Sequence, residues 1–229
     1  MSIEAYGYSS WQTRMRDPAL IGLLAIQCMM IFLAAPLAPI GNWGARALSE
    51  LLILAFAVLV YFVSRGPVTA AIAAAAMIAG VMGSALQLWA PSSASSLLAH
   101  IASFTALTVA AYIVGRAVFA PGTITRQRVL GAIGLYLNIG LMFATVYRLI
   151  WDIFPQSMGN IPSDQDSWQA YGTIIYFSFV TLTTVGYGDV VPIHPFARAL
   201  SNLEAIIGQL YPATLLARLV AQELEQRRV

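Results

Sequence analysis

Six long stretches of apolar residues dominate this chain and leave it few possible folds. A helix that crosses a lipid bilayer needs about 20 mostly apolar residues, and each stretch comes close to that length. The stretches cover Ala19–Leu37, Ala47–Val63, Val68–Trp89, Leu97–Phe119, Val129–Trp151 and Phe196–Val220. Backbone polar groups in lipid must find partners within their own segment, which favours helices. The sequence therefore predicts an all-α membrane protein with six transmembrane helices.

Composition excludes several other classes of protein. Hydrophobic residues make up 59% of the 229 residues and charged residues 10%, whereas a soluble domain carries about a quarter charged residues. The sequence shows no basic stripe for nucleic acid, no metal-ligand spacing and no nucleophile placed beside a base. Cys28 is the one cysteine, so an intrachain disulfide is impossible. We expect no enzymatic activity and no organic cofactor.

The positions of the arginines predict the orientation in the membrane, because positive residues favour the cytoplasmic side. With the N-terminus inside, most of the 12 basic residues fall on that side, and both termini are cytoplasmic. The arginines expected outside are Arg46, Arg148 and Arg198. The compact, alanine-rich and lysine-free chain suggests a bacterial inner membrane.

The segment between the fifth and sixth stretches, 152–195, starts outside and must return outside. Its second half, Trp168–Thr184, is apolar but only long enough for a helix that enters the membrane partway. The string Thr-Leu-Thr-Thr-Val-Gly-Tyr-Gly-Asp, Thr181–Asp189, follows directly. Non-helical backbone at membrane depth is tolerated where it is buried in protein or lines a watery pathway. We therefore predict a re-entrant helix followed by an extended, pathway-lining segment.

The chemistry of this string suits a bare monovalent cation. Gly186 and Gly188 permit backbone conformations closed to other residues, so successive carbonyl groups can turn toward one axis. Thr184 adds a hydroxyl oxygen at the inner end. Residues 184–188 contain no titratable acid, so the oxygen ligands would be neutral dipoles, which favours a weakly hydrated monovalent ion over a divalent one.

The motif Thr184–Asp189, Thr-Val-Gly-Tyr-Gly-Asp, resembles the selectivity signature of potassium channels, the pore-loop cation channel superfamily. The resemblance covers about Val129–Val220. It implies a homotetramer around a central pore, because each chain supplies one filter strand. It also implies that K⁺ is bound by a filter whose residues are Thr184, Val185, Gly186, Tyr187 and Gly188.

The resemblance extends to residues around the filter. It implies filter support from Tyr176, Phe177, Val180, Thr183 and Asp189. Tyr176 and Phe177 occupy the places of an aromatic cuff, and Tyr176 is expected to hydrogen-bond Asp189. Val180 stands where some relatives carry a glutamate, so one route to filter inactivation is absent.

Three residues of the last stretch are candidate gating residues. Gly208 matches a hinge glycine of the family, although close helix packing explains a glycine there equally well. Pro212 could bend the helix. Glu204, an acid at membrane depth, is a functional candidate by default. Glu204 could make gating sensitive to pH, but a satisfied structural hydrogen bond is the favoured interpretation.

Charged residues near the outer mouth are expected to be mostly solvated. They are Arg148, Asp152, Asp164, Asp166 and Arg198. The resemblance suggests that Arg198 pairs with an acid around the filter, and His194 is interpreted as an exposed surface histidine.

The first four stretches resemble the sensor of a voltage-gated channel in number but not in charge. A sensor needs several charges that move across the field, and Leu97–Phe119 carries only Arg116, at its inner end. We therefore expect no strong voltage dependence. The third stretch, rich in small residues, is expected inside the bundle. The predicted domains are an N-terminal cytoplasmic or interfacial segment (1–18), a four-helix sensor-like domain (19–122), a pore domain (123–222) and a short cytoplasmic tail (223–229).

Taken together, the sequence predicts a passive, potassium-selective channel in the cell membrane. A modulatory or sensor subunit that needs partner subunits is one alternative, and a weakly selective cation channel is another. A potassium uptake system is disfavoured, since such chains carry four pore loops. Membrane lipids are expected partners, and an unidentified regulatory ligand or partner protein stays open.

Overall fold

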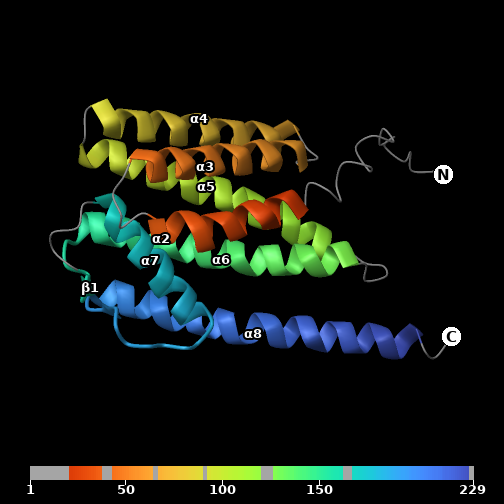
Figure 1. Ribbon diagram of the computed structural model, residues 1–229. Helices are drawn as coiled ribbons and strands as arrows, with labels where there is room; N and C mark the ends of the chain where they lie inside the picture. Colours follow the sequence, from red (N-terminus) through yellow and green to blue (C-terminus); the bar gives the residue numbers. More distant parts are fainter. Residues whose placement is uncertain are drawn as a thin grey trace.

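The structure is a computed structural model, and it describes residues 21–37, 43–63, 67–89, 92–119, 126–161 and 167–226. Every predicted apolar stretch is helical wherever it is described (Figure 1). Residues 21–29 are helical and continue into η1 and α2. The elements are η1 (Met30–Ala34), α2 (Ala35–Leu37), α3 (Trp43–Val63), α4 (Pro67–Trp89), α5 (Ser93–Val118), α6 (Arg126–Ile153), β1 (Met158–Gly159), α7 (Ser167–Leu182), β2 (Val191–Pro192) and α8 (Pro195–Gln226).

Some predictions fall outside the described residues. The proposed N-terminal segment 1–18 does, and so do Asp164 and Asp166. The expected tail at 223–229 is helical as far as Gln226, because α8 continues beyond Val220 without a break.

Local sequence explains two helix boundaries. Ser92 and Ser95 form a capping box at the start of α5, in which each side-chain oxygen accepts from the other residue's backbone N–H at 3.2 Å. This pairing satisfies donors that a helix start leaves open. Before Pro36, the first helix widens into the π-helix η1, where the Ala35 N–H donates to the Met30 carbonyl. Pro36 cannot donate to the preceding turn, so a local change in hydrogen bonding is expected there.

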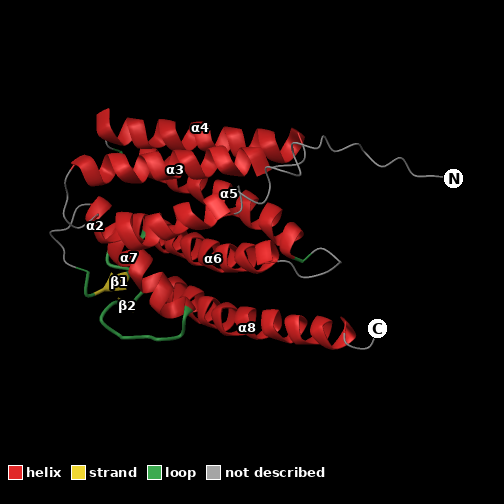
Figure 2. Ribbon diagram, turned by 45° about the vertical axis from the view of Figure 1, so that its right-hand side comes forward, coloured by secondary structure: helices red, strands yellow, loops and turns green. Residues whose placement is uncertain are grey.

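The helices form one elongated bundle, with the short α7 packed between α6 and α8 (Figures 1 and 2). The small residues of α4 predicted a position inside the bundle. Helix α4 instead lies at the edge of the bundle. One face of α4 packs on α5, where Gly83 lies against the Ala99 backbone, while Val68 and Ile78 are exposed on another. Small residues therefore mark a close contact but not a central position.

Two described helices are long and apolar enough to cross a membrane, Ser93–Arg116 and Arg128–Ile153. Shorter apolar helices cover Ile21–Leu37, Ala47–Tyr61, Val68–Gly83 and Ala170–Leu182. Helical structure thus follows the prediction, whereas the count of six membrane crossings stays a prediction.

The buried residues form two apolar clusters that meet along α6. One joins the first helix, α3, α5 and α6 around Phe56, Leu107 and Leu135. The other joins α6, α7 and α8 around Tyr147 and Ile174. Helix α6 therefore connects the four-helix part of the chain with the part that carries the filter motif.

Candidate ion-conducting site

The filter motif begins where α7 ends, and the helix end holds its first residues. The Thr183 N–H donates to the Phe179 carbonyl at 3.0 Å. The Val180 carbonyl then accepts from two filter residues, from Val185 N–H at 3.0 Å and Gly186 N–H at 3.2 Å. Carbonyls at a helix C-terminus lack partners in the helix itself. The filter strand therefore uses the open end of α7 as its anchor.

Backbone conformation alternates along the motif. Positive φ angles occur at Thr184 (60°), Gly186 (59°) and Gly188 (77°), and the residues between them do not share this conformation. Sequence reasoning pointed to the two glycines but not to Thr184, because a β-branched residue rarely adopts positive φ. Every second residue is therefore left-handed, which a regular helix or strand does not allow.

The filter segment lies on the surface of the single chain. All residues from Thr183 to Asp189 are exposed, including the large side chains of Val185 and Tyr187. A Cβ built at Gly186 or Gly188 would meet nothing within 4 Å. The requirement for glycine at these positions therefore comes from backbone conformation rather than from crowding within the chain.

Residues around the filter make several contacts with it. The Tyr176 hydroxyl hydrogen-bonds the Asp189 side chain, and Asp189 Oδ1 accepts from the Val190 N–H at 3.0 Å. Phe177 is buried and meets the Tyr147 ring edge-on, with centroids 5.0 Å apart. The Tyr176 contact thus connects the end of the motif at Asp189 to α7, while the Phe177 contact connects α7 to α6.

A short antiparallel pairing holds the chain where it leaves the filter. In it β1 pairs with β2, so that Met158 faces Pro192 and Gly159 faces Val191. The Ser157 carbonyl also accepts from the backbone N–H groups of Ile193 and His194. The segment after the filter is thus tied to the loop that follows α6, a contact with no signal in the sequence.

Two residues of this segment differ from expectation. Arg198 donates from Nε to the Pro192 carbonyl at 3.0 Å, and no ion pair of Arg198 occurs within the described part of the chain. His194 is half-buried rather than plainly exposed, since its ring stacks on Phe154 with centroids 4.2 Å apart. Within the described chain, Arg198 thus binds a backbone carbonyl instead of an acid, and His194 packs on an aromatic ring.

Helix α8 approaches the end of α7 so closely that only glycine fits between them. A Cβ at Gly208 would collide with the carbonyl group of Leu182. The same carbonyl oxygen accepts from the Tyr136 hydroxyl at 3.1 Å. This contact favours the packing explanation for Gly208, while its use as a hinge stays a prediction. Helix α8 continues through Pro212, whose missing N–H leaves the Gly208 carbonyl without its helical donor.

Glu204 is fully buried on the face of α8 that points toward α6 and α7. Its Oε2 accepts from the Tyr147 hydroxyl at 2.7 Å, and its Oε1 lies 2.5 Å from Ser178 Oγ. Ser178 Oγ also lies 2.8 Å from the Gly140 carbonyl oxygen. The sequence pattern pointed to Glu204 but not to Ser178 or Tyr147. Both are polar residues within otherwise apolar helices, and a polar group at membrane depth needs a hydrogen-bond partner. This feature could have identified them.

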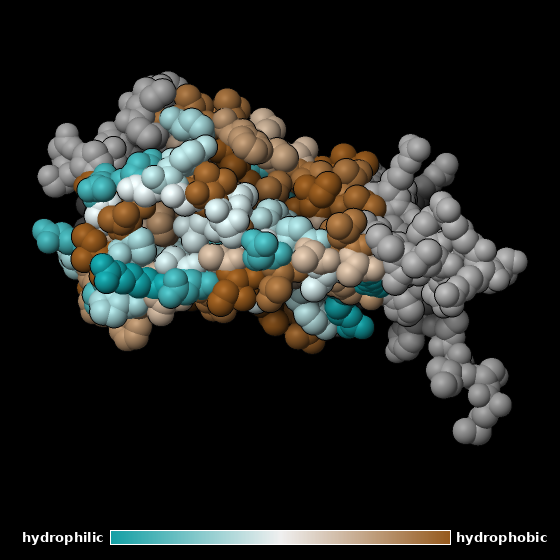
Figure 3. All heavy atoms as spheres, turned by 90° about the horizontal axis from the view of Figure 1, so that it is seen from below, coloured by the Kyte–Doolittle hydropathy of each residue, from teal (hydrophilic) through white to brown (hydrophobic). Residues whose placement is uncertain are grey.

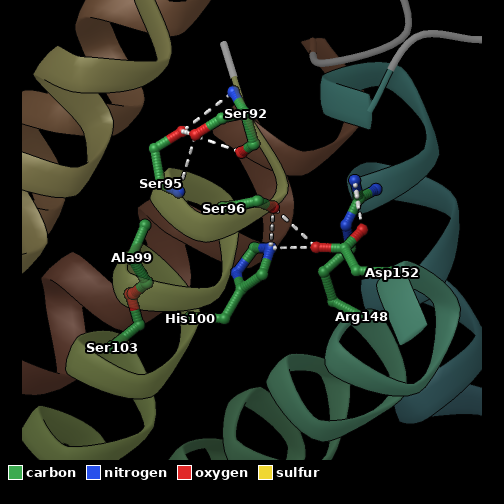
Figure 4. A network of polar contacts seen from close by, with 8 residues as sticks. All are labelled: Ser92, Ser95, Ser96, Ala99, His100, Ser103, Arg148 and Asp152. Carbon is green, nitrogen blue, oxygen red and sulfur yellow. Dashed lines mark hydrogen bonds and ion pairs between the residues drawn. The ribbon is translucent and has the colours of Figure 1, made fainter. Parts of the chain in front are cut away.

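A second polar network links α5 to the C-terminal end of α6 (Figure 4). Asp152 accepts from Ser96 at 2.6 Å, and its carboxylate lies 3.1 Å from His100 Nε2 and 3.0 Å from Arg148. Arg148 was expected to be solvated but is buried, because it lies on the face of α6 that packs in the bundle. Ser96 and Asp152 both face the same ring nitrogen of His100, so the group is not a proton relay of the Ser-His-Asp kind.

Several large apolar side chains of α8 are exposed along the pore part. Leu203, Ile206, Leu210 and Leu216 are all exposed. Hydrophobic side chains alternate with polar ones on this side of the molecule (Figure 3). At the opposite end from the filter, the Arg218 guanidinium lies over the ring of Phe119, 5.3 Å from its centroid.

Comparisons with known proteins match the region that contains this site. Residues 133–224 match the model of a family described as "Ion channel". The inward rectifier potassium channel Kirbac3.1 of Paramagnetospirillum magnetotacticum is 34% identical over 77 residues, 34% of this chain and 23% of that protein. Protein LctB of Bacillus caldotenax is 34% identical over 89 residues, 37% of this chain and 64% of that protein. The chain therefore spans less than two thirds of either relative.

The region from α6 to α8 thus matches an ion-channel family, and the chain around it has the apolar helices of a membrane protein. The resemblance to pore-loop potassium channels is confirmed by the family match and by a potassium channel among the relatives. The matches indicate a channel rather than an enzyme.

Proposed function

We propose that this chain forms a homotetrameric channel that conducts K⁺ passively and selectively. The observation that carries the proposal is the alternating backbone of the filter, with positive φ at Thr184, Gly186 and Gly188. Positive φ at every second residue allows successive carbonyl groups to turn to the same side of the strand. A ring of such carbonyls can replace the hydration shell of K⁺. The Thr184 hydroxyl adds one oxygen at the inner end.

Exposure of the filter supports assembly with further copies. One filter strand can surround an ion on one side only, so further strands are needed on the opposite side. In the single chain the side chains of Val185 and Tyr187 are exposed, which leaves room for such neighbours. The apolar outer face of α8 likewise needs a cover, either lipid or another subunit. Four copies around an axis beside the filter would close the ring and cover part of this face.

The four-helix part supports a channel without strong voltage dependence. In α5, Arg116 lies in the last turn and its guanidinium is 3.1 Å from the Tyr112 hydroxyl. A steep response needs several charges per subunit, each moving through the field. We place the chain in the bacterial inner membrane with both termini in the cytoplasm. The arginines at the ends of α5 and α8 support this orientation.

Potassium flux from proteoliposomes tests the proposal. The purified chain should carry K⁺ down its gradient much faster than Na⁺, with no other subunit present. Gly186→Ala should abolish selective flux, since alanine strains a backbone at φ 59°. Gly80→Ala is the matched control, because its new methyl would meet Ala102 at an ordinary 3.8 Å.

Each alternative predicts a different result. Equal K⁺ and Na⁺ flux would favour a weakly selective cation channel. A folded tetramer without flux, which gains flux only when mixed with other subunits, would favour a modulatory subunit. Wild-type flux from Gly186→Ala would contradict the role of the filter backbone.

A further inference from the structure

The contacts of Glu204 require one more proton than its two hydroxyl partners can supply. Three short oxygen–oxygen contacts meet there. They join Tyr147 Oη to Glu204 Oε2, Ser178 Oγ to Glu204 Oε1, and Ser178 Oγ to the Gly140 carbonyl, at 2.7, 2.5 and 2.8 Å. Each contact needs a hydrogen between the two oxygens. The two hydroxyl groups provide one hydrogen each.

A neutral carboxylic acid closes this count. Tyr147 donates to Glu204 Oε2, the acid proton on Oε1 is donated to Ser178 Oγ, and the Ser178 hydroxyl donates to the Gly140 carbonyl. With an ionised Glu204, one of the two contacts of Ser178 would join lone pairs without a hydrogen. Glu204 is also fully buried, and no basic side chain pairs with it among the described residues. A buried carboxyl group without a cation becomes neutral rather than remaining charged.

The resulting chain of hydrogen bonds joins three helices in a closed circuit. It runs from the α6 backbone at Gly140 to Ser178 on α7, to Glu204 on α8, and returns to α6 at Tyr147. Helix α6 has no side chain at Gly140, where a Cβ would lie 2.7 Å from the Phe179 ring. The close approach at this glycine lets Ser178 reach the backbone of α6.

The position of Ser178 connects this circuit to the filter through α7. Ser178 lies one helical turn before Leu182, the last residue of α7, and the filter begins two residues later at Thr184. A shift of α7 along its axis would move the Val180 carbonyl that anchors Val185 and Gly186. The circuit therefore fixes the depth and rotation of the helix from which the filter is built.

We propose that Glu204 is a positioning residue that acts as a neutral acid. Its O–H completes the circuit among α6, α7 and α8 and holds the filter in its conducting arrangement. This inference rests on the proposed function, because the conducting role of the filter comes from it. The titratable groups facing Glu204 are Tyr147 and Tyr136, both on α6. No charged side chain faces it from the described parts of α7 or α8.

Glutamine distinguishes a neutral acid from an ionised one. In Glu204→Gln the amide oxygen accepts from Tyr147 and the amide N–H donates to Ser178, so all three contacts survive. We expect wild-type K⁺/Na⁺ flux ratios from Glu204→Gln and a loss of about tenfold from Glu204→Ala, which opens the circuit. Alkaline buffer that ionises Glu204 should lower the ratio in the wild type but not in Glu204→Gln.

An infrared difference spectrum provides a readout that does not depend on conduction. Wild type minus Glu204→Gln should show the C=O stretch of a protonated carboxylic acid at neutral pH. The absence of this band would overturn the neutral acid. A Glu204→Gln channel as unselective as Glu204→Ala would overturn it as well. A wild-type chain without K⁺ flux would overturn the proposed function and the conducting role of the circuit, whereas the infrared band would still decide the protonation state.

A double-mutant cycle covers the case in which Glu204→Ala fails to assemble. Tyr147→Phe and Ser178→Ala each remove one partner of the same carboxyl group, so their effects on the flux ratio should be strongly non-additive. Tyr112→Phe and Ser103→Ala on α5 are matched controls with no expected effect on selectivity. Additive effects of the Tyr147 and Ser178 substitutions would overturn the circuit.

Discussion

The pore part and the four-helix part of this chain are held together by different kinds of contact. In the pore part, hydroxyl and carboxyl groups join different helices, as in the contacts of Glu204 and in the bond from Tyr136 to the Leu182 carbonyl. In the four-helix part, α4 and α5 meet through small side chains, with Gly83 against the Ala99 backbone. Polar contacts fix both the position of a helix along its axis and its rotation about that axis. Contacts between small side chains fix the distance between two helices more than their register. The part that carries the filter motif thus has the more directional contacts.

Helix α6 belongs to both parts and carries the polar contacts between them. At its C-terminal end Asp152 meets Ser96 and His100 of α5. In its middle, Asn138 accepts from Gln27 at 3.1 Å and donates to the Leu107 carbonyl at 2.8 Å. The two parts are therefore joined at two depths, and substitutions on each side can test how far they depend on one another.

The largest effect is expected within the pore part, from Gly208→Ala. The new methyl would collide with the Leu182 carbonyl and push α8 away from the end of α7. We expect a loss of at least about 3 kcal/mol of stability, at the upper end of overpacking costs, and loss of flux. Thermal unfolding in detergent and flux assays measure both.

Gly115→Ala on α5 is the control for this substitution, since its methyl would lie 3.7 Å from Leu135. Normal stability and flux from Gly208→Ala would show that α8 moves freely at this point, in favour of a hinge.

A smaller effect is expected from the same change in the four-helix part. Gly83→Ala brings a methyl to 2.9 Å from the Ala99 backbone nitrogen, so α4 must shift away from α5. A loss of about 1–3 kcal/mol follows from such overpacking. Because the contact is far from the filter, K⁺/Na⁺ selectivity should stay unchanged. Altered selectivity in proteoliposomes would mean that the two parts are more tightly coupled than their contacts indicate.

A still smaller effect is expected from a substitution at the contact between the two parts. Asp152→Ala removes the acceptor shared by Ser96, His100 and Arg148. The carboxylate is partly exposed, so we expect a loss of about 1–2 kcal/mol in thermal unfolding. Ser103→Ala, which removes a bond within α5, is the control. An unfolding transition equal to the wild type would exclude a structural role for this network.

The smallest effect is expected from Arg116→Gln. If α5 is not a voltage sensor, current–voltage curves of the substituted channel should keep the wild-type steepness. Each gating charge would be worth about 2.3 kcal/mol per 100 mV, so even one lost charge would be visible. A clear loss of steepness would assign α5 a sensing role and remove the contrast between the two parts.

Local features of this molecule could be predicted from sequence, and contacts between distant segments could not. Apolar stretches predicted the helices because backbone groups in lipid need partners within the segment. Gly186 and Gly188 predicted positive φ because glycine alone tolerates it freely. Arg148 was misjudged because a linear sequence does not tell which side of α6 faces the bundle. Ser178 lies 26 residues from Glu204, and nothing in either segment names the other as its partner.

At Thr184 the residue that would be most stable differs from the residue that the proposed function requires. A β-branched residue at φ 60° sits about 1–2 kcal/mol above its relaxed backbone. Glycine would relieve that cost but would remove the hydroxyl that the proposed function assigns to K⁺ binding. A directed-evolution screen that rewarded only heat resistance would therefore drift toward glycine here. Engineering of this protein should hold position 184 fixed and look for added robustness in the helices instead.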